Sequence, residues 1–205
     1  MIKITQYGFR DGRLILKKLT VEDKMPVSYT IPYFRGVSST AILEAWDVSA
    51  GTAVKYNTAF SVQPPYAVEL SVHAVAAGTA DGAAGDGLIF KGWDAKGNWI
   101  QETVYVSSTN GTSADAYSYT NNSFAKIYSI VPDDALHKST DVNIGWRDVV
   151  GLPYQIDAAS DILTAQVGLN YATTALTVDK TYDSVSLSGL SEGSTFNIVW
   201  LSRVQ

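Results

Sequence analysis

Few residues of this chain have the types and spacing that enzymes use. It holds two histidines, His73 and His137, and no cysteine. A serine nucleophile activated by histidine is commonly presented on a Gly-x-Ser-x-Gly elbow, and no such elbow occurs in the sequence. The lack of cysteine excludes disulfides, thiolate metal sites and cysteine nucleophiles. We therefore expect no catalytic residues and a protein that is not an enzyme.

Acidic residues gather in two segments that could hold a metal ion or form an acid–base pair. They are "DGAAGDG", with Asp81 and Asp86, and "DDALHKSTD", with Asp133, Asp134, His137 and Asp141. A glycosidase needs two carboxylates about 5–10 Å apart, whereas adjacent aspartates point in opposite directions along a strand. Neither segment has the twelve-residue calcium loop that ends in glutamate, and no phosphate-binding glycine loop is present. We expect these aspartates to form turns, with no metal and no cofactor.

Charge is distributed unevenly along the sequence. Residues 1–35 carry seven Lys/Arg and three Asp/Glu, a balance of +4, so the remainder of a chain with net charge −5 carries −9. Nucleic-acid binding by the acidic remainder is disfavoured, whereas the basic N-terminal segment is suited to an acidic partner. The alternative is that this uneven distribution of charge arises by chance, because only ten charged residues lie in the segment 1–35.

The sequence lacks the segments that direct a chain to a membrane. It contains no run of about 18 apolar residues, and its N-terminus lacks the apolar core of a secretory signal. We expect a protein of the cytoplasm that contacts no membrane.

Short alternating segments separated by Gly, Asn, Ser and Asp dominate the chain, which is typical of strands joined by turns. These segments are residues 66–75, 87–93, 99–106, 125–131, 141–146, 161–169, 174–179, 184–190 and 195–204. Helical patterns are limited to a turn or two at 40–46 and 133–136. The pattern predicts an all-β protein whose body is a β-sandwich, jelly-roll-like or a barrel.

One hairpin is well specified, in "FKGWDAKGNWIQETVYV" at residues 90–106. Gly97 can adopt the positive φ that a short loop needs, and Asp94 and Asn98 can bind nearby backbone. On the second strand, Glu102 lies on the same face as Ile100, Val104 and Val106, which are all apolar. A carboxylate that is buried there without a partner would cost free energy. We expect Glu102 to lie exposed at the rim, to pair with a cation or amide there, or to lie in a subunit contact.

Three regions follow from these patterns. Residues 1–60 are expected to form an extended N-terminal arm and its connection, and residues 61–150 the main β domain. Residues 151–205 supply further strands, either of the same sandwich or of a small second unit. Within the arm, "KMPVSYTIPYFRG" at 24–36 has two prolines and three aromatic residues without clean alternation, which favours an extended segment lying on another surface. The polar tract 106–124 is expected to be a long hairpin excursion.

Candidate partner-binding residues follow from the arm's charge and aromatic content. They are Tyr29, Ile31, Tyr33, Phe34 and Arg35, together with Arg10, Arg13, Lys17 and Lys18. A separate possibility is a carbohydrate site built on exposed tryptophans. Its candidates are Trp93, Trp99, Trp146 and Trp200, although tryptophans in strands more often belong to a core or an interface.

Residues 75–170 resemble structural proteins of tailed bacteriophage particles. The matching residues are Gly92-Trp93-Asp94, Asn98, Ile100, Glu102-Thr103-Val104, Ser123-Phe124 and Ile127, followed by the linker-like "VGLPYQIDAASDIL". Trp93 departs from the leucine usual at its position. The resemblance implies an auxiliary capsid protein of the decoration or cement type, and it transfers no active-site residues.

Such a protein is expected to bind the major capsid protein and to associate with itself as a homotrimer. It would belong to the virion and be assembled in the host cytoplasm. The alternatives are another virion component, such as a jelly-roll coat, neck or tail protein, and a receptor- or carbohydrate-binding module.

Overall fold

The structure is a computed structural model and describes ten ranges of the chain. They are residues 2–10, 13–21, 24–48, 54–75, 87–105, 116–133, 141–168, 170–171, 176–187 and 190–203. Strands dominate these ranges, with two short 3-10 helices, η1 (Asn57–Ala59) and η2 (Ala159–Asp161). In the described ranges, no helix has the length and apolar character needed to cross a membrane. The prediction of an all-β protein is confirmed.

The strands form four antiparallel sheets. An N-terminal hairpin contains β1 (Ile2–Arg10) and β2 (Arg13–Val21). The first four-stranded sheet has the order β5 (Lys55–Tyr56), β10 (Lys126–Pro132), β7 (Gly87–Trp93), β8 (Trp99–Tyr105). The largest sheet has the order β14 (Thr177–Asp179), β15 (Ser184–Ser186), β11 (Asp141–Gly151), β6 (Val68–Val75), β9 (Ala116–Phe124), with β4 (Ser38–Asp47) also paired to β11. The last sheet has the order β13 (Asn170–Tyr171), β12 (Ile162–Val167), β16 (Phe196–Arg203), β3 (Lys24–Ile31).

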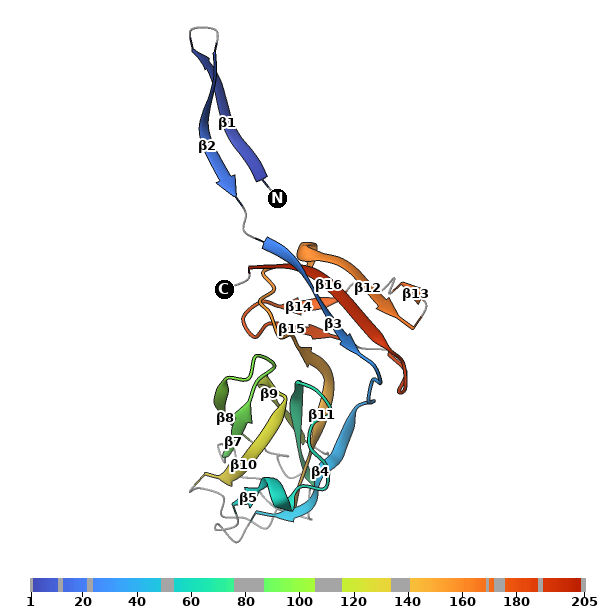
Figure 1. Ribbon diagram of the computed structural model, residues 1–205. Coiled ribbons are helices and arrows are strands. Elements are labelled where there is room, and N and C mark those ends of the chain that lie inside the picture. Colours follow the sequence, from blue (N-terminus) through green and yellow to red (C-terminus); the bar gives the residue numbers. More distant parts are fainter. Residues whose placement is uncertain are drawn as a thin grey trace.

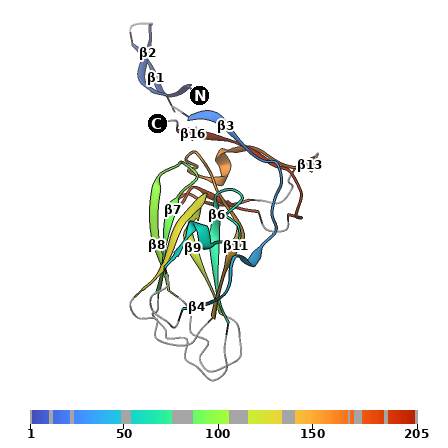
Figure 2. The same ribbon diagram turned by 60° about the horizontal axis from the view of Figure 1, so that its bottom comes forward.

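One hydrophobic core joins the three sheets of the body. Phe90 of β7, Phe124 of β9 and Trp200 of β16 are all fully buried in it. Strand β6 shows how the alternation works, because Val68, Leu70 and Val72 face this core while the residues between them lie on the opposite face. Figure 2 shows β7, β8 and β10 on one side and β6, β9 and β11 on the other, curving around this interior.

The expected arm at residues 24–36 is wrong. Lys24–Ile31 is strand β3, which pairs with β16 along its whole length, from Lys24 opposite Arg203 to Ile31 opposite Phe196. Ile31 is 1% exposed and Phe34 2% exposed, so both belong to the core. Pro26 is compatible with this because β3 lies at a sheet edge, where a missing N–H is tolerated, and Pro32 follows the end of the strand.

Strand pairing crosses the boundaries of the three expected regions, which were placed after residue 60 and after residue 150. β3 and β4, from the region before residue 61, pair with β16 and β11. β15, from the region after residue 150, pairs with β11 in the largest sheet. Segments from both ends of the chain therefore complete one body.

The predicted helical turn at 40–46 is also wrong, since these residues lie in β4. Its pairing with β11 has two register irregularities, and Ala45 has φ +46°. Ile42, Leu43 and Trp46 are buried, a spacing that resembles a helix because the irregular backbone interrupts the two-residue alternation. Of the turn expected at 133–136, only Asp133 lies within the described residues.

The hairpin between β7 and β8 forms as predicted. Gly97 has φ +82°, and Asp94 Oδ1 accepts hydrogen bonds from the backbone N–H groups of Lys96 and Asn98, each at 2.8 Å. The expected excursion at 106–124 is only partly tested, because residues 106–115 lie outside the described residues. Residues 116–124 form strand β9.

The N-terminal hairpin stands apart from this body. Figures 1 and 2 both show β1 and β2 projecting beyond β3 and the C-terminal end of the chain. The extensive packing of each of these strands is with the other. The element that projects from the body is therefore this hairpin, whereas the segment 24–36, on which the predicted arm was centred, belongs to the body.

Candidate functional site

Three of the predicted partner-binding residues are taken up by the body. Ile31 and Phe34 are buried, and Phe34 stacks on Tyr66 with ring centroids 6.3 Å apart. Tyr29 is half-buried, and burial raises its pKa. Burial also raises the pKa of Tyr66 to about 12, while its hydroxyl accepts a 3.0 Å hydrogen bond from the Arg35 backbone N–H. These side chains stabilise the fold rather than present a surface.

Tyr33 and Arg35 remain at the surface. The Arg35 guanidinium lies 4.9 Å from the centroid of the Tyr33 ring, and Arg35 Nη1 lies 3.5 Å from Glu192 Oε1. Both members of this ion pair are more than half exposed, so its contribution to stability is small. Of the five predicted residues between 29 and 35, these two are the most accessible to a partner.

The four basic candidates lie in the projecting hairpin. Arg10 and Arg13 form its last pair before the connecting loop, and Lys18 is registered opposite Gln6. Lys17 lies in β2 at a register irregularity. These residues are therefore remote from Tyr33 and Arg35 along the chain and belong to a different element.

A cluster of four aromatic residues, three of them exposed and Trp93 partly buried, lies on the sheet β5–β10–β7–β8, and we call it the aromatic face. Its members are Trp93, Trp99, Tyr128 and Tyr56. Trp93 and Trp99 have ring centroids 4.9 Å apart, and Tyr128 lies 5.6 Å from Trp99 and 6.0 Å from Tyr56. Trp99 is 51% exposed, Tyr128 43% and Tyr56 51%.

Strand alternation and register bring these rings together. In β7, Leu88 and Phe90 are buried, so Trp93 falls on the opposite, outward face. Trp93 is registered opposite Trp99 on β8 and opposite Lys126 on β10. The Lys126 ammonium lies 5.6 Å from the Trp93 ring centroid, within range of a cation–π interaction.

Sequence reasoning identified only part of this face. Trp93 and Trp99 were among the candidate tryptophans, whereas Tyr128 and Tyr56 were missed. For Tyr128 the signal was available, because strand alternation places it on the face opposite to its neighbours Ile127 and Ser129, which are both buried. The other two candidates are buried: Trp146 Nε1 donates to the Gly36 carbonyl at 2.9 Å, and Trp200 Nε1 to the Gln155 carbonyl at 3.0 Å.

A second aromatic group lies on the polar face of the largest sheet. The His73 ring stacks on Tyr117 at 4.3 Å and 4°, Tyr117 lies 6.4 Å from Tyr119, and the Arg147 guanidinium lies 4.1 Å from the Tyr119 ring. Arg147 Nη1 also donates to Glu69 Oε2 at 3.0 Å. Burial raises the pKa of Glu69 to about 7, and the nearby Arg147 opposes this only in part.

Glu102 is held by the neighbouring strand β9. One carboxylate oxygen accepts from the backbone and side-chain N–H groups of Asn121, at 2.7 and 3.0 Å. The other accepts from the same two groups of Asn122, both at 2.9 Å. Of the alternatives for Glu102, pairing with amides is confirmed.

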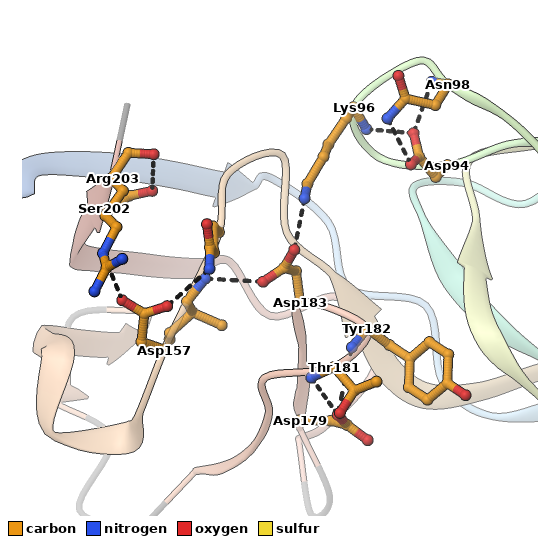
Figure 3. A network of polar contacts seen from close by, with 12 residues as sticks. Asp94, Lys96, Asn98, Asp157, Asp179, Thr181, Tyr182, Asp183, Ser202 and Arg203 are labelled. Atoms are coloured by element: carbon orange, nitrogen blue, oxygen red, sulfur yellow. Dashed lines mark hydrogen bonds and ion pairs between the residues drawn. The ribbon is translucent and has the colours of Figure 1, made fainter. Parts of the chain in front are cut away.

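A polar network surrounds Asp183, as Figure 3 shows. Asp183 Oδ2 accepts from the Lys96 ammonium, Asp183 Oδ1 accepts from the Ile156 backbone N–H at 3.0 Å, and the Asp183 carbonyl accepts from the Leu152 N–H at 2.7 Å. Asp183 has φ +49°, a left-handed conformation that aspartate adopts more readily than most residues. These bonds tie the β7–β8 loop to the turn between β14 and β15, so the network joins parts of the body.

The aspartate segments considered for metal binding are largely untested. Asp81, Asp86, Asp134 and His137 lie outside the described residues. Within the part of the chain that the structure describes, no three His, Asp or Glu side chains converge as metal ligands would.

Comparison of the chain with protein-family models, curated proteins and solved structures gave no significant match.

Proposed function

We propose that this chain is a decoration protein of a tailed-bacteriophage head, a structural subunit that binds the major capsid protein. The resemblance of residues 75–170 to phage particle proteins supports this class. The aromatic face is the observation that carries the proposal, because it is a contiguous set of four rings on one sheet, three of them exposed. Such surfaces are typical of protein–protein docking sites.

The composition of the aromatic face suits a protein partner. Tryptophan and tyrosine are enriched among the residues that dominate binding free energy. The rings pack edge to face, with interplanar angles of 83° for Trp93–Trp99 and 79° for Tyr56–Tyr128, so the unbound surface already restricts their rotation. Less conformational entropy is then lost on binding.

Charge around the face favours an acidic partner surface. Among the described residues, the outward positions of β7, β8 and β10 include Lys91 and Lys126 and no Asp or Glu. The chain outside residues 1–35 is strongly acidic as a whole, so this basic patch is a local exception. It provides orientation as well as attraction when the subunit meets the shell.

A decoration protein stabilises a shell by mass action, since it binds the assembled form and not the dissociated subunits. A homotrimer of this chain would match the local three-fold positions of an icosahedral shell. In this role the β body supplies a rigid platform and needs no catalytic group.

Binding to purified head shells that lack the protein tests the proposal. We expect Trp99→Ala with Tyr128→Ala to raise the Kd by roughly a hundredfold, because two central aromatic contacts are removed. Leu163→Ala is the control, since Leu163 is also exposed but lies on β12 in another sheet. Equal affinity of the double variant and the control would refute docking through the aromatic face.

A carbohydrate- or receptor-binding module is the second candidate, because Trp99 is exposed enough to stack on a sugar ring. The mutual tilt of the rings counts against it, since Trp99 and Tyr128 meet at 61° and do not form one flat platform for successive sugars. A glycan array distinguishes the two: specific binding that Trp99→Ala abolishes would favour the second candidate.

A further inference from the structure

Tyr117 and Tyr119 place two nearly parallel rings at the edge of the largest sheet. They lie two positions apart on β9, so strand alternation puts both side chains on the same face of the sheet. The planes of the two rings differ by 16°, and their centroids are 6.4 Å apart. We call this pair the tyrosine platform.

One face of each ring is covered, and both are covered from the same side. His73 of β6 is registered opposite Tyr117 and stacks on it, with centroids 4.3 Å apart and planes inclined by 4°. The Arg147 guanidinium, from β11, lies 4.1 Å from the centroid of Tyr119. β9 ends the order of the sheet, and β6 and β11 follow it, so both covering groups approach from the interior of the sheet. The two tyrosine rings therefore stand side by side along β9, with their uncovered faces turned away from β6.

The uncovered faces are accessible and held in a fixed orientation. Tyr117 is 44% exposed and Tyr119 43%, although each ring has one covered face. Within the described ranges, no third group stacks on either ring. The covering groups are themselves constrained, because His73 is buried and Arg147 Nη1 donates to Glu69 Oε2 at 3.0 Å. A surface that is ordered before its ligand arrives loses less conformational entropy on binding.

We propose that the tyrosine platform binds a neutral carbohydrate, whose pyranose rings stack on the uncovered faces of Tyr117 and Tyr119. The face of an aromatic ring is electron-rich and attracts the weakly positive C–H groups that line one side of a sugar ring. Two rings that stand side by side and nearly in one plane give these C–H groups a flat surface. The aromatic face lacks this property, because Trp99 and Tyr128 meet at 61°.

Charge and a neighbouring amide favour a neutral sugar over a nucleic acid. Bases also stack on exposed aromatic rings, but the chain after residue 35 carries −9 and repels phosphates. Asn121, the second residue after Tyr119, is exposed, and within the described ranges its side-chain oxygen has no hydrogen bond. This oxygen can accept from a sugar hydroxyl, which adds the directional contact that stacking does not supply.

A glycan array probed with the full-length protein tests the inference, and each hit is then titrated as the free oligosaccharide. We expect binding to neutral glycans. Tyr117→Ala with Tyr119→Ala should weaken this binding by about tenfold or more, because both stacking surfaces are lost. Tyr117→Phe with Tyr119→Phe keeps both rings and should bind within about twofold of the unmodified chain. Tyr154→Ala is the matched control and should bind normally, since Tyr154 is also 44% exposed but lies between β11 and η2.

A second measurement does not depend on the stability of the alanine variant. In the unmodified chain, the bound oligosaccharide should shift the ring-proton NMR resonances of Tyr117 and Tyr119, which are assigned by their loss in the phenylalanine variant. Absence of these shifts would overturn the inference, as would equal affinity of the alanine variant and the control.

Two further results would also overturn the inference. One is an array without a neutral glycan among its hits, and binding of single-stranded oligothymidine in a parallel titration would then assign the platform to nucleic acid. The other is loss of glycan binding in Trp99→Ala, which would place the sugar on the aromatic face. The inference does not rest on the proposed function, because the tyrosine platform and the aromatic face belong to different sheets.

Discussion

Lys24 Nζ lies 2.9 Å from Asp161 Oδ1 and 2.8 Å from Asp161 Oδ2, and 2.9 Å from Asp157 Oδ2. These contacts join the first residue of β3 to η2 and the segment before it. The hydrogen bond to Asp161 is the largest cause of the raised pKa of Lys24, and the bond from Lys24 lowers the pKa of Asp157. The body of the protein therefore begins at Lys24, and the projecting hairpin ends before it.

This boundary predicts the effects of two deletions. Removal of residues 1–21 should leave the unfolding midpoint in urea unchanged at low protein concentration, because the hairpin does not pack in the body. Removal of residues 1–35 should abolish cooperative unfolding or lower the free energy of unfolding by at least about 4 kcal/mol, because β3 and the buried Phe34 are lost. Tryptophan fluorescence measures both. Equal midpoints for the two deletions would contradict the boundary.

The raised pKa of Glu69 predicts that the stability of the protein depends on pH. Its pKa is about 7 in the folded protein against an ordinary value of 4.5, so the folded state binds the proton more tightly than the unfolded state. The stabilisation from protonated Glu69 is complete below about pH 4.5 and is lost as the pH rises through 7. A shift of this size corresponds to roughly 3 kcal/mol.

Glu69→Gln provides the comparison for this group. Between pH 5 and pH 8, the free energy of unfolding of the unmodified protein should fall by roughly 2–3 kcal/mol more than that of the variant. Arg147 keeps its contact with Tyr119 in the variant and is partly exposed, so its lost partner costs little. Parallel pH profiles for the two proteins would show that Glu69 ionises normally.

Glu102 should be important for the packing of β8 against β9. Glu102→Ala leaves four N–H groups of Asn121 and Asn122 without their acceptor and should cost about 2 kcal/mol. The neighbouring Gln101 is exposed, so Gln101→Ala should change stability by less than about 0.5 kcal/mol. Unfolding in urea gives the free energy of unfolding of each variant for this comparison. Similar small effects for both would mean that water replaces the carboxylate without loss.

Two substitutions of Asp183 separate its backbone role from its ion pair. Asp183→Asn keeps a side chain that tolerates positive φ and can still accept from the Ile156 N–H, so it should cost about 1 kcal/mol. Asp183→Ala loses that acceptor as well and strains the left-handed backbone, so it should cost about 3 kcal/mol. Equilibrium unfolding gives both values, and the reverse order would contradict this account of the turn.

The parts of the fold that sequence predicted are those set by local interactions. The β7–β8 hairpin depends on alternation and on turn residues at Asp94 and Gly97, which lie within a few positions of one another. The pairing of β3 with β16 was missed because Lys24 meets Arg203, at the opposite end of the chain. Without its partner, the segment with two prolines resembled a free extended arm.

The candidate surfaces show the same limit. Trp93 and Trp99 could be named from one hairpin, but the aromatic face also needs Tyr128 and Tyr56, which β10 brings alongside through register.

The central claim is that the chain is a decoration protein of a phage head. The most direct measurement is a quantitative mass-spectrometric census of purified particles of the phage that encodes it, calibrated against the major capsid protein. We predict on the order of hundreds of copies per particle, as expected for a subunit that repeats over an icosahedral shell. About six or twelve copies, which would indicate a neck or tail component, or absence from the particle, would contradict the claim.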